Sequence, residues 1–222
     1  MLFLLYWFID YMASVFIYLI MFSCIGSTAV LVEDLTLQVT KGHLFSSLKY
    51  EYKIPYLGGM TLAYVIGLIF GISLTFAWYF TLNWMINNIL GIILCITFLK
   101  IIRLSSLIPG IVLLILLFGY DIFAVFLTPL FTKNGESVMI AVATRLEAPI
   151  KLYMPHLTDG YPNSSCSLLG LGDILIPGIF ICFLAKFGTL VSHSSIYFRC
   201  SLISYFLALV LCGSMVWIFH QG

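Results

Sequence analysis

Long apolar runs recur along this chain, and they constrain its fold more than any other feature. A helix needs about 20 consecutive apolar residues to cross the roughly 30 Å hydrocarbon core of a bilayer. Five runs reach that length, and a shorter sixth contains two asparagines. We count the sixth as a span because its neighbours would otherwise have to connect across the membrane. The six predicted spans are 11–32, 56–82, 84–99, 108–131, 166–186 and 195–219.

The composition supports a membrane protein of the all-α class, a multi-span transmembrane helical bundle. The 222 residues are 62% hydrophobic and only 9% charged, a balance that no ordinary water-soluble core requires. The net charge is +1 and the Lys and Arg are dispersed, so no basic face exists for a nucleic-acid partner. The expected surroundings are the lipid bilayer. Without internal repeats or a soluble-domain boundary, residues 1–222 are interpreted as a single transmembrane domain.

The distribution of Lys and Arg predicts the orientation of the spans, because cytoplasmic loops carry an excess of these residues. Loops 33–55, 100–107 and 187–194, with their flanks, hold seven Lys and Arg, whereas the loops on the opposite side hold three. The first set is therefore assigned to the cytosol. Loop 132–165 and both termini are then expected on the lumenal or extracellular side.

Polar and small residues within the other spans have structural interpretations. Ala63, Gly67 and Gly71 repeat every four residues in the second span, a spacing that lets a neighbouring helix approach closely. Asn87 and Asn88 are expected to form hydrogen bonds between helices. The histidines lie in loops or at span ends without carboxylates or cysteines at ligand spacing, so neither a metal site nor another cofactor is predicted.

Two aspartates lie in strongly apolar surroundings, in "FGYDIFAVF" (Asp121) and in "LLGLGDILIPGIF" (Asp173). An ionised carboxylate near the bilayer centre costs several kcal/mol, so a residue of this type is a functional candidate. The two predicted spans are consecutive and antiparallel. Asp121 precedes the end of its span at Phe131 by ten residues, and Asp173 follows the start of its span at Cys166 by seven. At about 1.5 Å per residue, the distances of the two aspartates from these span ends agree within roughly one helical turn, so both are expected at a similar depth in the membrane.

Two facing carboxylates supply what peptide hydrolysis requires. In a low dielectric they cannot both ionise easily, so the pair holds a shared proton. The ionised member can take a proton from an attacking water, while the protonated member donates to the developing oxyanion. The residues alone leave three interpretations open: a protease, a transporter or channel that uses the pair as a proton or cation site, and a structural hydrogen-bonded pair.

Glycine and proline residues near the two aspartates fit a site that the backbone of a substrate can approach. Gly170 and Gly172 carry no side chain and loosen a helix. Pro129 and Pro177 can leave further backbone carbonyls without a helical donor. Each of these residues, taken alone, is also typical of ordinary packing in membrane helices.

Together, "YD" at Tyr120 and Asp121 and "GLGD" at Gly170 to Asp173 resemble the paired signature of the GxGD intramembrane aspartyl proteases, which include presenilins and signal peptide peptidases. The flanks "YDIFAVFLTPLFTKNGESVM" and "SLLGLGDILIPG" resemble signal peptide peptidase-like proteins, particularly the type 2 branch. The resemblance extends almost continuously from Tyr52 to Gly222.

The resemblance implies an aspartic-type intramembrane endopeptidase without a cofactor. Asp121 and Asp173 would be catalytic, and substrates would be membrane proteins of type II orientation. The residues implied to bind substrate or shape the site are Tyr120, Gly170, Leu171 and Gly172. A homo-oligomer is compatible with this assignment, and the expected location is the endomembrane system (endoplasmic reticulum, Golgi, endosome or lysosome membrane) or the plasma membrane.

The resemblance also implies nine spans, of which the six predicted here correspond to the third through eighth. The chain is therefore expected to be truncated at both ends relative to the family. The Pro-Ala-Leu motif of the family's ninth span does not occur in this sequence. A catalytically inactive truncated form is the alternative to an active protease.

Overall fold

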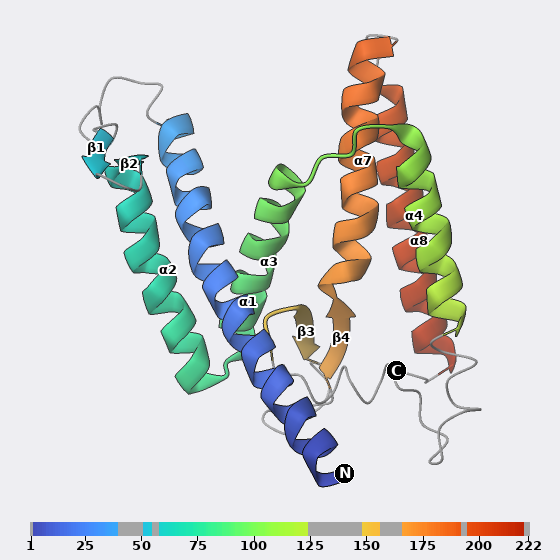
Figure 1. Ribbon diagram of the computed structural model, residues 1–222. Helices are drawn as coiled ribbons and strands as arrows, with labels where there is room; N and C mark the ends of the chain where they lie inside the picture. Colours follow the sequence, from blue (N-terminus) through green and yellow to red (C-terminus); the bar gives the residue numbers. More distant parts are fainter. Residues whose placement is uncertain are drawn as a thin grey trace. The chain divides into compact units, whose positions relative to one another are not determined.

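A computed structural model describes the backbone of this chain at residues 2–39, 51–54, 58–123, 148–155, 166–191 and 195–219. Side chains are described within 14–38, 61–123, 148–154, 168–191 and 195–214. The chain divides into two compact units (Figure 1). Unit 1 comprises Met1–Thr97 and Glu147–Met154, and unit 2 comprises Phe98–Leu146 and Pro155–Gly222.

Unit 1 is built on the packing of α1 (Leu2–Val39) against α2 (Leu62–Thr81). The helices approach closely because glycines of α2 face the backbone of α1. A Cβ placed on Gly67 would lie 2.8 Å from Cα of Ala29, and one on Gly71 would collide with the Thr28 hydroxyl. Ala63, Gly67 and Gly71 are all buried. The predicted close approach of a neighbouring helix along this stripe is confirmed.

A short antiparallel ladder precedes α2 and fixes where that helix begins. Strands β1 (Glu51–Ile54) and β2 (Gly58–Thr61) pair with Glu51 opposite Thr61. Thr61 is the N-cap of α2, and its hydroxyl accepts a hydrogen bond from the Tyr64 N–H at 3.3 Å. The same hydroxyl donates to the Glu33 carboxylate on α1 at 2.7 Å. Within the span predicted from residue 56, Gly58–Thr61 therefore form a strand, and the helix begins only at Leu62.

The asparagines of α3 (Trp84–Ile101) hold an extended segment, β3 (Lys151–Pro155). The Asn87 amide donates to the Lys151 carbonyl at 2.7 Å. Asn88 both donates to the Tyr153 carbonyl and accepts from the Tyr153 N–H, each at 2.8 Å. The expectation of bonds between helices was wrong, because a primary amide matches the donor and acceptor of an extended backbone, whose groups no helix satisfies.

Unit 2 contains the end of α3, then α4 (Leu107–Ile122), β4 (Cys166–Gly170), α7 (Leu171–Val191) and α8 (Ile196–Phe219). Helix α7 packs against both α4 and α8. The contact with α4 is close at Gly110, where a Cβ would lie 2.8 Å from the Phe180 ring. Within this unit, α7 runs antiparallel to α4 and to α8 (Figure 1).

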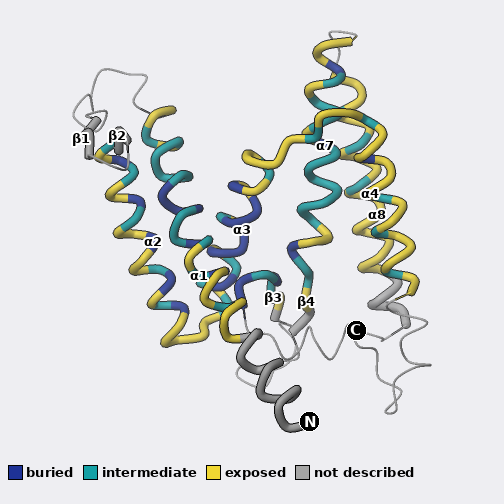
Figure 2. Tube along the Cα trace, in the orientation of Figure 1, coloured by how far each residue is buried: buried dark blue, intermediate teal, exposed yellow. Residues whose placement is uncertain are grey.

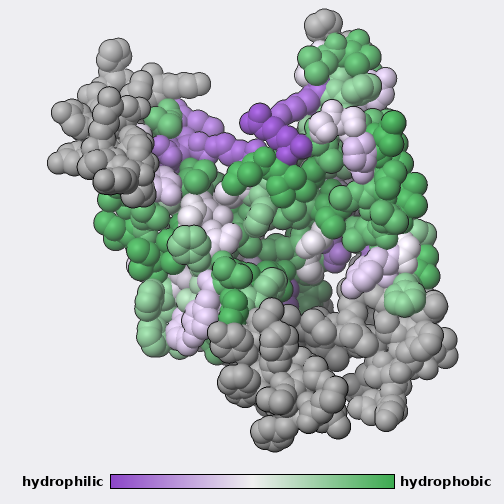
Figure 3. All heavy atoms as spheres, in the orientation of Figure 1, coloured by the Kyte–Doolittle hydropathy of each residue, from purple (hydrophilic) through white to green (hydrophobic). Residues whose placement is uncertain are grey.

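The lengths and composition of these helices confirm the predicted multi-span helical membrane fold. Among the described residues, five helical segments are long and apolar enough to cross a bilayer, and α4 is a shorter apolar helix. Nearly all of the described part of α8 is exposed (Figure 2), and the exposed surfaces of the helices are largely apolar (Figure 3). Such surfaces suit lipid, which solvates apolar side chains as well as a protein core does. The five segments are Ser14–Gln38, Leu62–Thr81, Trp84–Ile101, Leu171–Val191 and Ile196–Ser214.

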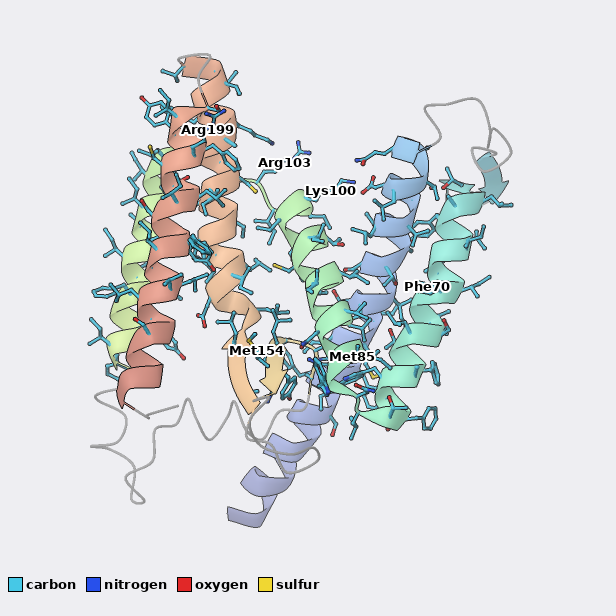
Figure 4. All side chains as sticks on the ribbon, turned by 180° about the vertical axis from the view of Figure 1, so that it is seen from behind. Phe70, Met85, Lys100, Arg103, Met154 and Arg199 are labelled. Atoms are coloured by element: carbon cyan, nitrogen blue, oxygen red, sulfur yellow. The ribbon has the colours of Figure 1, made fainter. Side chains whose placement is uncertain are left out.

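Three cations among the described residues of unit 2 lie toward one end of its helices. Lys100 is in the last turn of α3, Arg103 lies in the link to α4, and Arg199 is in the first turn of α8 (Figure 4). All three belong to the set that the charge count assigned to the cytosol. The cytosolic orientation itself stays a prediction.

Candidate active site

The first aspartate lies at the end of the described part of α4. Asp121 is the second-last residue of that helix and is half-buried. The residues from 124 to 131, which the sequence analysis included in the same span, lie outside the described residues, as does Pro129. The predicted depth of Asp121 from the end of its span at Phe131 therefore stays a prediction.

The second aspartate lies in the first turn of α7, where Asp173 is the third residue. The sequence analysis placed it seven residues into a helix that starts at Cys166, and this was wrong. Residues Cys166–Gly170 form strand β4, and the helix begins at Leu171. Short apolar runs suit strands and helices alike, and glycine is a poor helix former. A carboxylate in the first turn is favoured by the partial positive charge of the helix N-terminus.

The packing of α4 against α7 brings the two aspartates to the same end of unit 2. Because the helices are antiparallel, the last turn of α4 and the first turn of α7 lie at the same end of the helix pair (Figure 1). The Asp121 carboxylate is close enough to act electrostatically on the Asp173 carboxylate. The cations Lys100, Arg103 and Arg199 lie at the opposite end of these helices. The two carboxyl groups are therefore at the end of unit 2 that is far from Lys100, Arg103 and Arg199.

Gly170 leaves the space into which the Asp173 side chain fits. A Cβ placed on Gly170 would lie 3.3 Å from Oδ2 of Asp173 and 3.9 Å from its Cγ. A methyl group at this position would therefore crowd the carboxylate directly. This contact gives Gly170 a local role that the sequence analysis did not identify, because it had attributed the glycine to the approach of a substrate backbone.

The remaining residues of the two motifs have different surroundings. Leu171, the first residue of α7, is buried, with 5% of its surface exposed. A Cβ on Gly172 would meet nothing within 4 Å among the described residues, which leaves the space beside it open. Tyr120 is 62% exposed, and within the described part of the chain its hydroxyl has no hydrogen bond to either carboxylate. Its role in contacting substrate stays a prediction.

Sequence reasoning missed Tyr205 on α8, whose hydroxyl donates to the backbone carbonyl of Asp173 at 3.1 Å. A single tyrosine in an apolar span gives no signal of its own. Pro177 was the feature of the sequence that could have indicated it, because a proline four residues after Asp173 cannot donate a helical N–H to the Asp173 carbonyl. That carbonyl needs a donor from elsewhere in the chain.

No cluster of three or more His, Cys, Asp or Glu side chains that could hold a metal occurs among the residues whose side chains are described. The described acidic side chains of the two motifs are those of Asp121 and Asp173. Most of loop 132–165 lies outside the described residues, and only residues 148–155 of it are seen.

Comparison with known proteins was made for the whole chain. A family model described as signal peptide peptidase matches residues 1–222. Signal peptide peptidase-like 2B of Mus musculus is 35% identical over 239 residues, which cover 100% of this chain and 41% of the relative. The protein of the same name from Gallus gallus is 34% identical, covering 95% of this chain and 37% of the relative. Signal peptide peptidase of Homo sapiens is 36% identical over 152 residues, which cover 67% of this chain and 37% of the relative. The chain thus spans about two fifths of the length of these relatives. No solved structure matches it.

Proposed function

This chain belongs to the signal peptide peptidase family, and on that premise we propose that it is an aspartic endopeptidase that hydrolyses peptide bonds within the membrane. The catalytic residues in this proposal are Asp121 and Asp173. The observation that supports it most directly is that two packed antiparallel helices of one compact unit carry these two carboxyl groups at the same end.

The proposed chemistry needs one bound water and one shared proton. Two neighbouring carboxylates in a low dielectric hold a single proton between them, so one is ionised and the other is not. The ionised carboxylate takes a proton from water as the water oxygen bonds to the peptide carbonyl carbon, and the protonated carboxylate gives its proton to the carbonyl oxygen. When the tetrahedral intermediate collapses, the C–N bond breaks and the leaving amine takes a proton from one carboxyl. A hydroxyl of the intermediate gives its proton to the other carboxyl as the product acid forms, which restores the shared proton. Because the pair titrates as a unit, neither residue is assigned a fixed role.

The surroundings of the pair fit an extended substrate. A substrate helix must unwind before hydrolysis, because its own hydrogen bonds and side chains shield the carbonyl carbons. The two glycines of the motif have different surroundings, with open space beside Gly172 and the Asp173 carboxylate beside Gly170, so we assign them different roles. Gly172 would admit the substrate backbone, whereas Gly170 would accommodate the Asp173 carboxylate.

The chain is an integral membrane protein, as its family and its long apolar helices show. Within the proposal, its substrates are membrane proteins of type II orientation, and it acts in the endomembrane system or the plasma membrane. Loop 132–165 would then lie on the lumenal or extracellular side, and the cations at the other end of unit 2 would face the cytosol.

The test is cleavage of a tagged type II membrane stub in cells that lack their own proteases of this kind. We expect a cleavage product with the unaltered chain and none with Asp121→Ala or Asp173→Ala. Asp10→Ala is the matched control, since Asp10 also lies in an apolar stretch, on α1, and it should leave cleavage unchanged. Membrane insertion of each variant is checked by its resistance to alkaline extraction.

Two outcomes would contradict the proposal. Product formed by either aspartate variant would remove the paired-carboxylate mechanism. Absence of product from a well-inserted chain would show that this chain alone is not an active protease, and Asp-dependent ion flux in the same cells would then favour a transporter or channel.

A further inference from the structure

Pro177 removes a hydrogen bond from the turn of α7 that carries Asp173. In an α-helix, the N–H of each residue donates to the carbonyl of the residue four positions earlier. The donor for the Asp173 carbonyl would therefore be residue 177, which is a proline and has no N–H. A carbonyl without a donor is costly in apolar surroundings, because no bulk water can replace the missing partner.

Tyr205 supplies a donor from the neighbouring helix. Its hydroxyl lies 3.1 Å from the Asp173 carbonyl oxygen. The two residues belong to α7 and α8 of unit 2, which pack against each other. The distance is slightly longer than is usual for a hydroxyl donor, so the bond is a long one. The bond thus ties the first turn of α7 to α8 at the residue that carries the carboxylate.

We propose that Tyr205 is a positioning residue for the hydrolysis: its hydroxyl replaces the helical donor that Pro177 lacks and fixes the turn that carries the Asp173 carboxylate. This inference rests on the proposed function, since it gives Tyr205 a role through Asp173. Tyr205 itself does not touch the reacting atoms. Its effect is on the position of Asp173, whose side chain is also confined by the narrow space beside Gly170.

The position of the first turn matters because helix ends are held less firmly than helix interiors. The first N–H groups of a helix have no intrahelical acceptor, and terminal turns fray. In α7, the first turn is weakened further because the Asp173 carbonyl receives no hydrogen bond from Pro177. A misplacement of about 1 Å in a catalytic group can reduce a rate by up to roughly a hundredfold. A single hydrogen bond that limits this movement is therefore expected to affect turnover.

A double-mutant cycle separates this role from simple packing. Tyr205→Phe removes the hydroxyl and keeps the ring, so we expect kcat to fall by roughly three- to tenfold with KM unchanged. Pro177→Ala restores an N–H at position 177, which can donate to the Asp173 carbonyl. In the Pro177→Ala background, the additional loss caused by Tyr205→Phe should therefore be less than about twofold.

The matched control for the hydroxyl is Tyr197→Phe on the same helix. The Tyr197 ring packs edge-on against Phe187, with 6.0 Å between the ring centroids, and phenylalanine keeps this contact. We expect Tyr197→Phe to leave both kcat and KM unchanged. The rates are measured on the purified chain in lipid vesicles with the tagged type II stub, over a range of substrate concentrations.

Thermal unfolding in detergent tests the bond without any need for activity. It is measured for the four chains of the cycle: the unaltered chain, Tyr205→Phe, Pro177→Ala and the double variant. We expect Tyr205→Phe to lower the unfolding midpoint in the original background and to change it little in the Pro177→Ala background. If the unaltered chain gives no Asp173-dependent product, the proposed function fails, yet this cycle still reports whether Tyr205 and Pro177 are coupled. The two failures are therefore distinguishable.

The inference is overturned if Tyr205→Phe lowers the unfolding midpoint, or kcat, by the same amount whether residue 177 is proline or alanine. It is also overturned if the loss appears in KM alone, because a positioning role for Asp173 requires an effect on turnover. A Tyr205→Phe chain that keeps full kcat in the original background would remove the role of the hydroxyl altogether.

Discussion

Replacing Gly170 by alanine is expected to slow peptide hydrolysis by crowding the Asp173 carboxylate. The added Cβ would lie 3.3 Å from Oδ2 and 3.9 Å from Cγ of Asp173, so the carboxylate must shift by a few tenths of an ångström or turn away from a relaxed rotamer. A side chain forced about 30° off its rotamer costs about 0.5–1.5 kcal/mol. Since about 1.4 kcal/mol corresponds to a tenfold change in rate, kcat should fall by roughly two- to tenfold.

The assay is the initial rate of cleavage of the tagged stub in lipid vesicles, from which kcat and KM are obtained separately. We expect Gly170→Ala to lower kcat with little change in KM, because the alanine methyl meets the enzyme's own carboxylate. Gly172→Ala should instead raise KM, since its methyl would enter open space that the proposal assigns to the substrate backbone.

Gly213→Ala on α8 is the control for adding a methyl group to this chain, because its Cβ meets nothing within 4 Å among the described residues. It should match the unaltered chain in both constants. The reasoning about Gly170 would be refuted if Gly170→Ala gave the same kcat as Gly213→Ala, or if its whole loss appeared in KM. Unfolding midpoints are compared in parallel, so that a lower amount of folded protein is not mistaken for a lower kcat.

Two further predictions concern unit 1. Gly67→Ala places a methyl 2.8 Å from a backbone atom of α1, which must move away; we expect a loss of about 1–3 kcal/mol in the free energy of unfolding, seen as a lower midpoint in detergent. Gly26→Ala, whose Cβ meets nothing within 4 Å among the described residues, is its control, and equal midpoints would refute the close packing. Asn88→Ala removes both side-chain hydrogen bonds to Tyr153; the Tyr153 amide should then exchange its hydrogen roughly fivefold or more faster, by mass spectrometry. Unchanged exchange would mean that Asn88 does not hold β3.

The sequence was sufficient to predict the membrane class and the helices, because length and hydropathy are set by the bilayer itself. It also indicated that Asp121 and Asp173 could face each other, since consecutive spans are antiparallel. The packing of their two helices is close at Gly110 and Phe180, a contact that no hydropathy pattern reveals. The catalytic role of the pair stays a proposal.

The sequence was insufficient where the partner of a group lies far along the chain. Hydropathy treats β4 and the start of α7 alike, so the change from strand to helix at Leu171 was missed. Asn88 was expected to pair with a helix, but its amide bonds to an extended segment 65 residues away. Tyr205 is 32 residues from Asp173, and only the folded chain shows which hydroxyl meets the carbonyl that Pro177 leaves without a helical donor.

The central claim is that Asp121 and Asp173 act together on one water. The most direct measurement is the rate of stub cleavage by the purified chain in lipid vesicles, for the unaltered protein, Asp121→Ala, Asp173→Ala and the double variant. Residues that act as a unit are strongly non-additive, so each single variant should lose all measurable cleavage and the double variant should be no slower. Cleavage that persists in either single variant, with losses that add in the double variant, would contradict the account.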